Sequence, residues 1–155
     1  MKLTILAVGK TKEKFLQIGE GIYLKKISPF CQVEIKIIRG LTDIKNQTKE
    51  KVIEKEGEEI LKKIPNDAHV VSLDRTGKRI NSEQMARQIE TWLQIGKPVF
   101  VVIGGAFGLS SAVKARSKII LSLSDLTFTH EMVRLIFLEQ LYRGFTIIKG
   151  VPYHY

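Results

Sequence analysis

Cysteine is almost absent from this sequence: Cys31 is the single one among 155 residues. A lone cysteine cannot form a disulfide within the chain, and such sparse usage is typical of proteins in a reducing cytoplasm. No residue near it in the sequence offers a base that would activate the thiol. We therefore expect a cytoplasmic protein in which Cys31 is a small apolar residue rather than a nucleophile.

Long apolar runs are also missing. None approaches the roughly 20 residues that a helix needs to cross a bilayer, and the first residues follow a strand pattern rather than that of a signal peptide. The histidines have no metal-ligand spacing relative to one another or to the cysteine; they are His69, His130 and His154. The carboxylates form no pair suited to acid–base catalysis. We therefore expect no membrane span and no metal site.

Positive charge, by contrast, is in excess. Lysine and arginine together number 25 against 16 acidic residues, which gives a net charge of +9 and a pI near 9.7. This balance indicates a polyanionic partner, either nucleic acid or an anionic membrane surface. No basic amphipathic helix of the membrane-surface kind stands out, so nucleic acid is favoured. A lysine-rich surface that serves only solubility is the alternative interpretation.

Strand and helix patterns alternate along the chain. Apolar runs predict strands at 2–8, 33–38, 70–73, 99–103 and 119–121. Helical spacing predicts helices at 12–27, 46–64, 82–96, 112–115 and 131–147. The strand at 99–103 has no polar alternation, which is typical of a central parallel strand covered on both faces. The sequence therefore predicts one α/β domain over 1–155, with a mostly parallel sheet and helices on both faces.

Three loops follow the carboxyl ends of predicted strands: 73–78, 104–110 and 121–129. Ligands of open α/β sheets lie outside these strand ends, so the loops predict a cofactor crevice. The glycine-rich loop 104–110 fits neither the dinucleotide fingerprint nor the phosphate-binding P-loop. Two plainer interpretations stay open. The glycines could serve only a tight turn, and the third loop could be an ordinary helix lead-in with Thr129 as its N-cap.

The C-terminal segment has two unusual features. The predicted helix at 131–147 is apolar on nearly every side, so we expect it to be covered by its own domain and also by more chain or a second copy. After it, cations and aromatic rings gather in one short region, formed by Arg143, Lys149, Tyr153, His154 and Tyr155. Cations bind phosphates and aromatic rings stack on bases, which indicates RNA binding. The alternative is a tail that folds onto a partner's core.

Several motifs, taken together and in order, resemble the RlmH (YbeA-like) family of SPOUT-class methyltransferases over the whole chain. They are Leu73-Asp74-x-x-Gly77-Lys78, the run from Ile103 to Ser110, Ser122-Leu123-Ser124-x-x-Thr127-x-x-His130, Glu139-Gln140-x-Tyr142-Arg143 and Pro152-Tyr153-His154. That family methylates N3 of a pseudouridine in the helix 69 loop of bacterial 23S rRNA. The resemblance implies this activity, on the assembled ribosome, for the present chain.

The resemblance also implies a homodimer with a trefoil knot at the C-terminal end, and S-adenosylmethionine bound in that knot. The cofactor-binding residues that it implicates come from the same three loops: Leu73, Gly104, Gly105, Leu123, Ser124, Asp125, Leu126, Thr127 and Phe128. The C-terminal helix would form the dimer interface, and the tail of one subunit would approach the target base.

In that tail, His154 is the candidate general base for the N3 proton, with Tyr153 as a second catalytic candidate. Arg143, Lys149 and Tyr155 are the candidate RNA contacts. Family members usually carry a basic residue directly after Pro-Tyr-His, where this chain has Tyr155. We therefore expect either that Arg143, Arg134 or Lys149 supplies the missing charge or that the phosphate contact is weaker. The alternative functions are a SPOUT methyltransferase acting on another RNA and a non-catalytic basic ribosome-binding factor.

Overall fold

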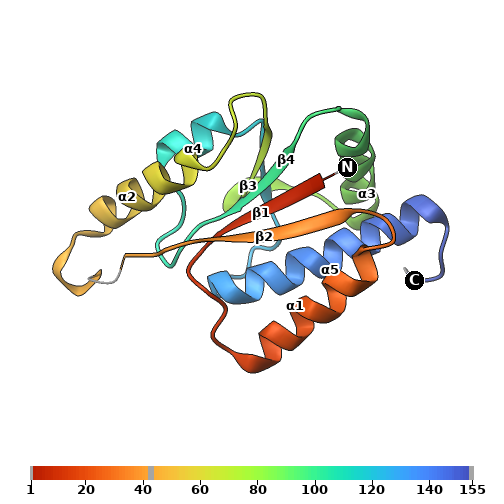
Figure 1. Ribbon diagram of the computed structural model, residues 1–155, viewed down its shortest axis with the longest axis horizontal. Helices are drawn as coiled ribbons and strands as arrows, with labels where there is room; N and C mark the ends of the chain where they lie inside the picture. The colour runs from red at the N-terminus through yellow and green to blue at the C-terminus, as the bar shows by residue number, and fades with distance from the viewer. Residues whose placement is uncertain (1, 42–43, 154–155) are drawn as a thin grey trace.

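A computed structural model describes residues 2–41 and 44–153 of the chain. Its strands form one parallel sheet in the order β2-β1-β4-β3-β5 (Figure 1). The strands are β1 (Lys2–Val8), β2 (Gln32–Ile38), β3 (His69–Arg79), β4 (Val99–Ile103) and β5 (Ile119–Ser122). All five residues of β4 are buried, as its unbroken apolar sequence predicts for a central strand.

Helices cover both faces of this sheet. They are α1 (Lys14–Ile27), α2 (Lys49–Lys62), α3 (Ser82–Gln94), α4 (Ser111–Arg116) and α5 (His130–Lys149), with a short 3₁₀ turn, η1 (Ile44–Asn46). Helix α5 packs between α1 and α3 on one face, while α2 and α4 lie together on the other (Figure 1). The predicted α/β class is confirmed, and the C-terminal trefoil knot stays a prediction.

Local sequence signals set several helix starts. Asn81 and Gln84 form the predicted capping box at α3, since the Asn81 side chain accepts from the Gln84 backbone and the Gln84 side chain accepts from the Asn81 backbone. Thr129 caps α5, because its hydroxyl accepts the Met132 backbone N–H at 3.2 Å. The two caps lie in the connections that follow β3 and β5, so they fix where α3 and α5 begin.

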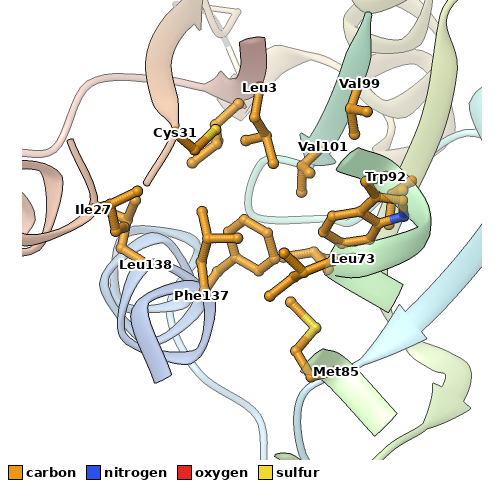
Figure 2. Close-up of a cluster of buried hydrophobic side chains, with 14 of the residues drawn as sticks. Leu3, Ile27, Cys31, Leu73, Met85, Trp92, Val99, Val101, Phe137 and Leu138 are labelled. Atoms are coloured by element: carbon orange, nitrogen blue, oxygen red, sulfur yellow. The ribbon is translucent and has the colours of Figure 1, made fainter. Parts of the chain in front are cut away.

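The larger core lies between the sheet and the layer of α1, α3 and α5. Figure 2 shows Leu3, Val101 and Leu73 of the sheet facing Phe137 of α5, with Trp92 of α3 alongside. A second core on the opposite face joins the sheet to α2 and α4. The sheet is therefore buried on both faces, which rigidly fixes the strand ends from which the loops emerge.

Strand β3 is longer than predicted. The sequence indicated a strand at 70–73 followed by a loop, whereas β3 runs to Arg79. Leu73 and Lys78 both pair with Leu121, with a register shift between them. A Cβ on Gly77 would lie 2.7 Å from the backbone of Ile120, so only glycine allows this close approach. The loop prediction for 75–78 is therefore wrong, because this pairing depends on a strand distant in sequence.

Helix α5 is covered by its own chain. No residue from His130 to Ile148 is exposed, since α1 and α3 flank the helix. Several of its apolar side chains, among them Val133, Leu135 and Tyr142, are only half-buried in the single chain, and a second copy over this helix stays a prediction. The exposed apolar stripe lies instead on α1, where Phe15, Ile18 and Ile22 are 60%, 56% and 49% exposed at helical spacing.

Replacing Phe137 with Ala tests this account of the core. The side chain is fully buried between α5 and the sheet, so we expect the substitution to cost about 3–5 kcal/mol of unfolding free energy. Urea denaturation at neutral pH measures it. Phe107→Ala is the matched control, because that ring is 37% exposed on a loop, and it should cost under about 1 kcal/mol. Equal losses in the two variants would contradict the assigned core.

Candidate active site

Three loops begin side by side at the carboxyl edge of the sheet. Leu73 pairs with Ile103 of β4 on one side and with Leu121 of β5 on the other. The segments that follow these residues enclose a cavity of about 860 Å³. This volume lies within the range of small-molecule sites. The crevice predicted from the strand ends is therefore present, and strand register creates it.

The cavity brings together most of the residues that sequence reasoning selected for the cofactor. Those that line it are Leu73, Gly104, Gly105, Leu123, Ser124, Leu126, Thr127 and Phe128. Asp125 does not line it, since its carboxylate forms an ion pair with Arg79 at 2.8 Å on the surface. The structure thus assembles the three loops into one site and leaves Asp125 at its margin.

The glycine-rich loop folds back tightly after β4. The Gly108 backbone N–H donates to the Gly105 carbonyl at 3.1 Å, and Gly108 has a φ of +90°. A Cβ on Gly104 would lie 2.7 Å from the Gly108 carbonyl oxygen. Glycines are therefore required for the turn itself. At Gly104, Gly105 and Gly108 the cavity wall carries no side chain, which allows a ligand to approach the backbone closely.

The third loop turns on its own polar side chains. The Ser122 hydroxyl donates to the Ser124 carbonyl at 3.1 Å, and the Ser124 hydroxyl accepts the Leu126 N–H at 3.0 Å. This folding directs Leu126 outward, where it is 72% exposed, and leaves Phe128 38% exposed. Both side chains line the cavity, so they offer uncovered apolar surface to a ligand or to another chain.

A half-buried ion pair lies at the cavity wall. The Lys114 ammonium of α4 is 2.8 Å from Asp74 Oδ2, and the Thr76 N–H and hydroxyl donate to Asp74 Oδ1 at 2.9 and 2.6 Å. Burial alone would raise the pKa of Asp74, but the Lys114 and Thr76 hydrogen bonds outweigh it and hold that pKa below its usual value. Asp74 is therefore ionised at neutral pH, fixed by partners from two elements.

The start of α5 contributes the opposite wall through His130 and Glu131. Burial lowers the pKa of His130, and the nearby Arg134 charge lowers it further. A neutral imidazole therefore faces the cavity at neutral pH. The Glu131 carboxylate accepts the Lys12 backbone N–H at 2.7 Å, which ties the segment after β1 to this end of α5.

Arg134 is fully buried beneath this wall. Its guanidinium donates to the Val8 carbonyl at 2.7 Å and to the Thr11 hydroxyl at 2.9 Å. A buried guanidinium cannot contact an RNA phosphate directly. Arg134 therefore does not replace the basic residue expected at position 155, and its contacts assign it to holding the turn after β1.

The tail folds onto its own helices, away from the cavity. The Tyr153 hydroxyl donates to Glu139 at 3.1 Å and lies 3.3 Å from the Tyr23 hydroxyl, and its ring stacks edge-on against Tyr142 at 4.8 Å. Arg143 joins the cluster, with its guanidinium 4.8 Å from the Tyr153 ring centre. Burial, then the Tyr23 hydroxyl and Glu139, raise the pKa of Tyr153, so its phenol stays protonated.

Along α5, Glu139 and Arg143 lie more than two turns beyond the cavity residues His130 and Glu131. The predicted RNA residue Arg143 therefore lies beside Tyr153, and neither Arg143 nor Lys149 lines the cavity. Lys149 is exposed at the end of the helix. The predictions for His154 and Tyr155 fall outside the described residues. Within one chain, the structure assembles the cofactor residues and the tail residues at separate places.

Comparison with known proteins identifies the family. A family model described as a predicted SPOUT methyltransferase matches residues 1–154.

The chain belongs to the SPOUT methyltransferase family.

Close relatives within it share the full length of the chain. Ribosomal RNA large subunit methyltransferase H of Halothermothrix orenii is 46% identical over 158 residues, covering 99% of each chain. The protein of the same name from Geotalea daltonii is 42% identical over 156 residues, covering 100% of each. The RlmH-like family indicated by the sequence motifs is thus confirmed.

A solved structure shows a related fold at much lower identity. A probable methylase family protein from Haemophilus influenzae Rd KW20 superposes with a TM-score of 0.54 at 11% identity. The match covers 99% of this chain and 70% of that one. Such a likeness supports the fold of this SPOUT methyltransferase and carries no information on its substrate.

One residue of this SPOUT methyltransferase site escaped the sequence reasoning. Glu56 of α2 is only 6% exposed and lies directly behind Gly105. The sequence does indicate that Glu56 lies on the buried face of α2. It comes four residues after Val52 and four before Ile60, both buried members of the apolar stripe of that helix. A charged residue in the middle of a buried stripe is uncommon and indicates a specific contact.

The described ranges, 2–41 and 44–153, contain no cluster of three or more potential metal-ligating side chains among His, Cys, Asp and Glu. No helix within those ranges is long and apolar enough to cross a membrane.

Asp74→Asn tests the ion pair of this SPOUT methyltransferase. A group with a lowered folded-state pKa adds stability that is present above its unfolded pKa, about 3.9, and is lost as pH falls through the folded value. We therefore expect Asp74→Asn to lose about 1–2 kcal/mol at pH 7, with a smaller difference from wild type at pH 3. Urea denaturation at both pH values measures this. Asp125→Asn, whose pair is largely exposed, should change little, and a pH-independent difference for Asp74→Asn would contradict the assigned pair.

Proposed function

We propose that this protein methylates N3 of a pseudouridine in the helix 69 loop of 23S rRNA, on the assembled ribosome, with S-adenosylmethionine as methyl donor. The observation that carries the proposal is the cavity where the three loops meet, in a SPOUT methyltransferase whose full-length relatives are named for large-subunit ribosomal RNA. The net charge of +9 supports a polyanionic substrate. Ribosomes are cytoplasmic, which is where we propose that it acts.

The cavity suits an S-adenosylmethionine molecule in size and lining. Leu73, Ile103 and Leu123 offer apolar surface for the adenine, and the turn from Gly104 to Gly108 offers backbone groups for its polar edges. The segment 123–128 would close over the ligand, with Leu126 and Phe128 as its uncovered apolar members. When bound, the cofactor supplies an electrophilic methyl group on a sulfonium. We propose that the chain forms its knot around this cavity within a single domain, 1–155.

The chain itself must position the base and remove its N3 proton. His154 is the proposed general base, since a neutral imidazole has a pKa suited to this transfer near neutral pH. Tyr153, which directly precedes it, is fixed by Glu139 and by the rings of Tyr142 and Tyr23. That anchorage would present His154 in a defined place. Arg143, Lys149 and Tyr155 are proposed to bind the RNA beside it.

A second copy of the chain would bring the tail to the cavity. In one chain, Glu139 of the Tyr153 cluster lies six residues along α5 beyond Val133, the last residue of that helix that lines the cavity. The exposed apolar stripe of α1 lies beside α5 and needs a cover. We therefore propose a homodimer that buries this stripe and places the tail of each subunit at the cavity of the other.

Methyl transfer to ribosomes tests the proposed reaction. Purified protein with radiolabelled S-adenosylmethionine should label 23S rRNA in ribosomes that lack this modification. Free tRNA should stay unlabelled, and primer extension should locate the product in the helix 69 loop. Gly105→Trp is the control, because the new side chain cannot be accommodated in the tight glycine turn. Label in tRNA would favour another RNA substrate, and absence of both labelling and cofactor binding would favour a non-catalytic ribosome-binding protein.

Mixing two inactive variants tests whether the tail acts on the partner's cavity. Gly105→Trp disrupts the cavity wall, because the new side chain would collide with Glu56 behind the loop, and His154→Ala removes the proposed base. Each alone should lose at least about 100-fold in activity. After subunit exchange, half of the dimers are mixed and each has one intact site, so about a quarter of wild-type activity should return.

The same mixture made with Ile18→Asp in both chains is the control. Ile18 is 56% exposed on α1, so a charge there should prevent the proposed dimer without disturbing the core. Activity should then fail to recover, and size-exclusion chromatography with light scattering should show monomers. Failure of the original mixture to recover, with dimers intact, would assign the tail to the cavity of its own chain. Wild-type activity of His154→Ala alone would instead remove His154 from the chemistry.

A further inference from the structure

Helix α2 contacts both ends of the glycine-rich loop from behind. Two consecutive residues make these contacts. Glu56 lies against Gly105, where an added Cβ would be 2.7 Å from Glu56 Oε2. Gly57 lies against Ser110, whose hydroxyl would collide with a Cβ on residue 57. One turn of α2 thus holds the loop near its start and at its end, where Ser110 caps α4 by accepting the Val113 N–H at 3.2 Å.

The contact between Glu56 and Gly105 lies at the wall of the cavity. Gly105 lines the cavity, and the side of it that lacks a Cβ meets Glu56. The residue therefore separates the proposed cofactor space from the carboxyl group behind it. Any shift of the Glu56 side chain towards the loop must move Gly105 into the cavity, because the packing between them leaves no room.

Burying the Glu56 carboxyl group at this position costs free energy. The side chain is 6% exposed, and Oε2 has no hydrogen-bond partner within residues 2–41 and 44–153. Burial raises the pKa of Glu56, and a hydrogen bond from the Leu41 backbone N–H lowers it by less. Val52 and Ile60, one turn away on either side, fill the same stripe with apolar groups. An apolar side chain at position 56 would fill the same space without the free-energy cost of burying a carboxyl group.

The carboxyl group also reaches a third segment. Besides the Leu41 hydrogen bond, Glu56 Oε1 lies 3.6 Å from where a Cβ on Gly40 would be. The side chain therefore joins the segment after β2 to the loop after β4, two strand ends that are separated by β1 in the sheet. Helix α2 supplies a polar brace between these segments, on the face opposite to α5.

We propose that Glu56 is a positioning residue that sets the place of Gly105 at the wall of the cavity and thereby controls the affinity for S-adenosylmethionine. This inference rests on the proposed function of the cavity. It predicts that a substitution at Gly105 acts through Glu56, since a new Cβ points at the carboxyl group and away from the bound ligand. Removing that carboxyl group should make room for the Cβ.

A double-mutant cycle tests the proposal, with S-adenosylmethionine affinity measured by calorimetry on the full chain. Glu56→Ala should weaken binding about tenfold, because Gly105 loses its support. Gly105→Ala should also weaken binding about tenfold in the wild-type background, and by less than about twofold when Glu56 is already Ala. Glu56→Gln should stay within about threefold of wild type, since the amide keeps the shape and the acceptor for Leu41. Glu59→Ala, an exposed change on the same helix, should bind as wild type does.

Unfolding free energies of the same variants without ligand separate positioning from folding. Coupling between Glu56→Ala and Gly105→Ala in both cofactor affinity and unfolding free energy supports the proposal. Coupling in stability without any coupling in affinity would assign Glu56 to packing alone and overturn it, as would a Gly105→Ala effect of equal size in both backgrounds. Wild-type protein that folds but fails to bind S-adenosylmethionine would instead overturn the proposed function of the cavity. The two failures are therefore distinguishable.

Discussion

The pairing of Leu73 with two neighbours at once is the constraint on which the site depends. Because Leu73 is in register with Ile103 and with Leu121, three strands end at one level and their loops open into the same space. Parallel pairing makes this possible, since it points all carboxyl ends to one edge. Burial of the sheet on both faces then holds the strand ends in place, so the residues at the start of each loop are rigidly positioned around the cavity.

Both helical layers complete that cavity, and they contribute different chemistry. From one face, the start of α5 provides His130 and Glu131, and Arg134 beneath them ties α5 to the segment after β1. From the other face, α4 provides Lys114 for its pair with Asp74, and α2 lies behind the glycine turn through Glu56. Charged groups at the wall are therefore held by partners from different elements. Such fixed polar groups need little reorganisation when a ligand enters.

Sequence patterns predicted the order of elements, the central strand β4, the capping box of α3 and the three loops, because each of these depends on neighbours along the chain. Patterns failed where contacts link distant segments. The extension of β3 depends on Gly77 meeting Ile120. Glu56 was overlooked for the same reason, since its role appears only when α2 lies against Gly105. The motifs supplied the family, which periodicity alone could not.

The central claim is that three loop segments form one binding site for S-adenosylmethionine. A titration of the cofactor into isotopically labelled protein, followed by amide NMR shifts, tests it most directly. The account predicts that the largest shifts fall on the amides of 73–76, 104–108 and 123–128 together, saturating with a single affinity. Shifts confined to one of these segments, or centred on the tail near Tyr153, would contradict it.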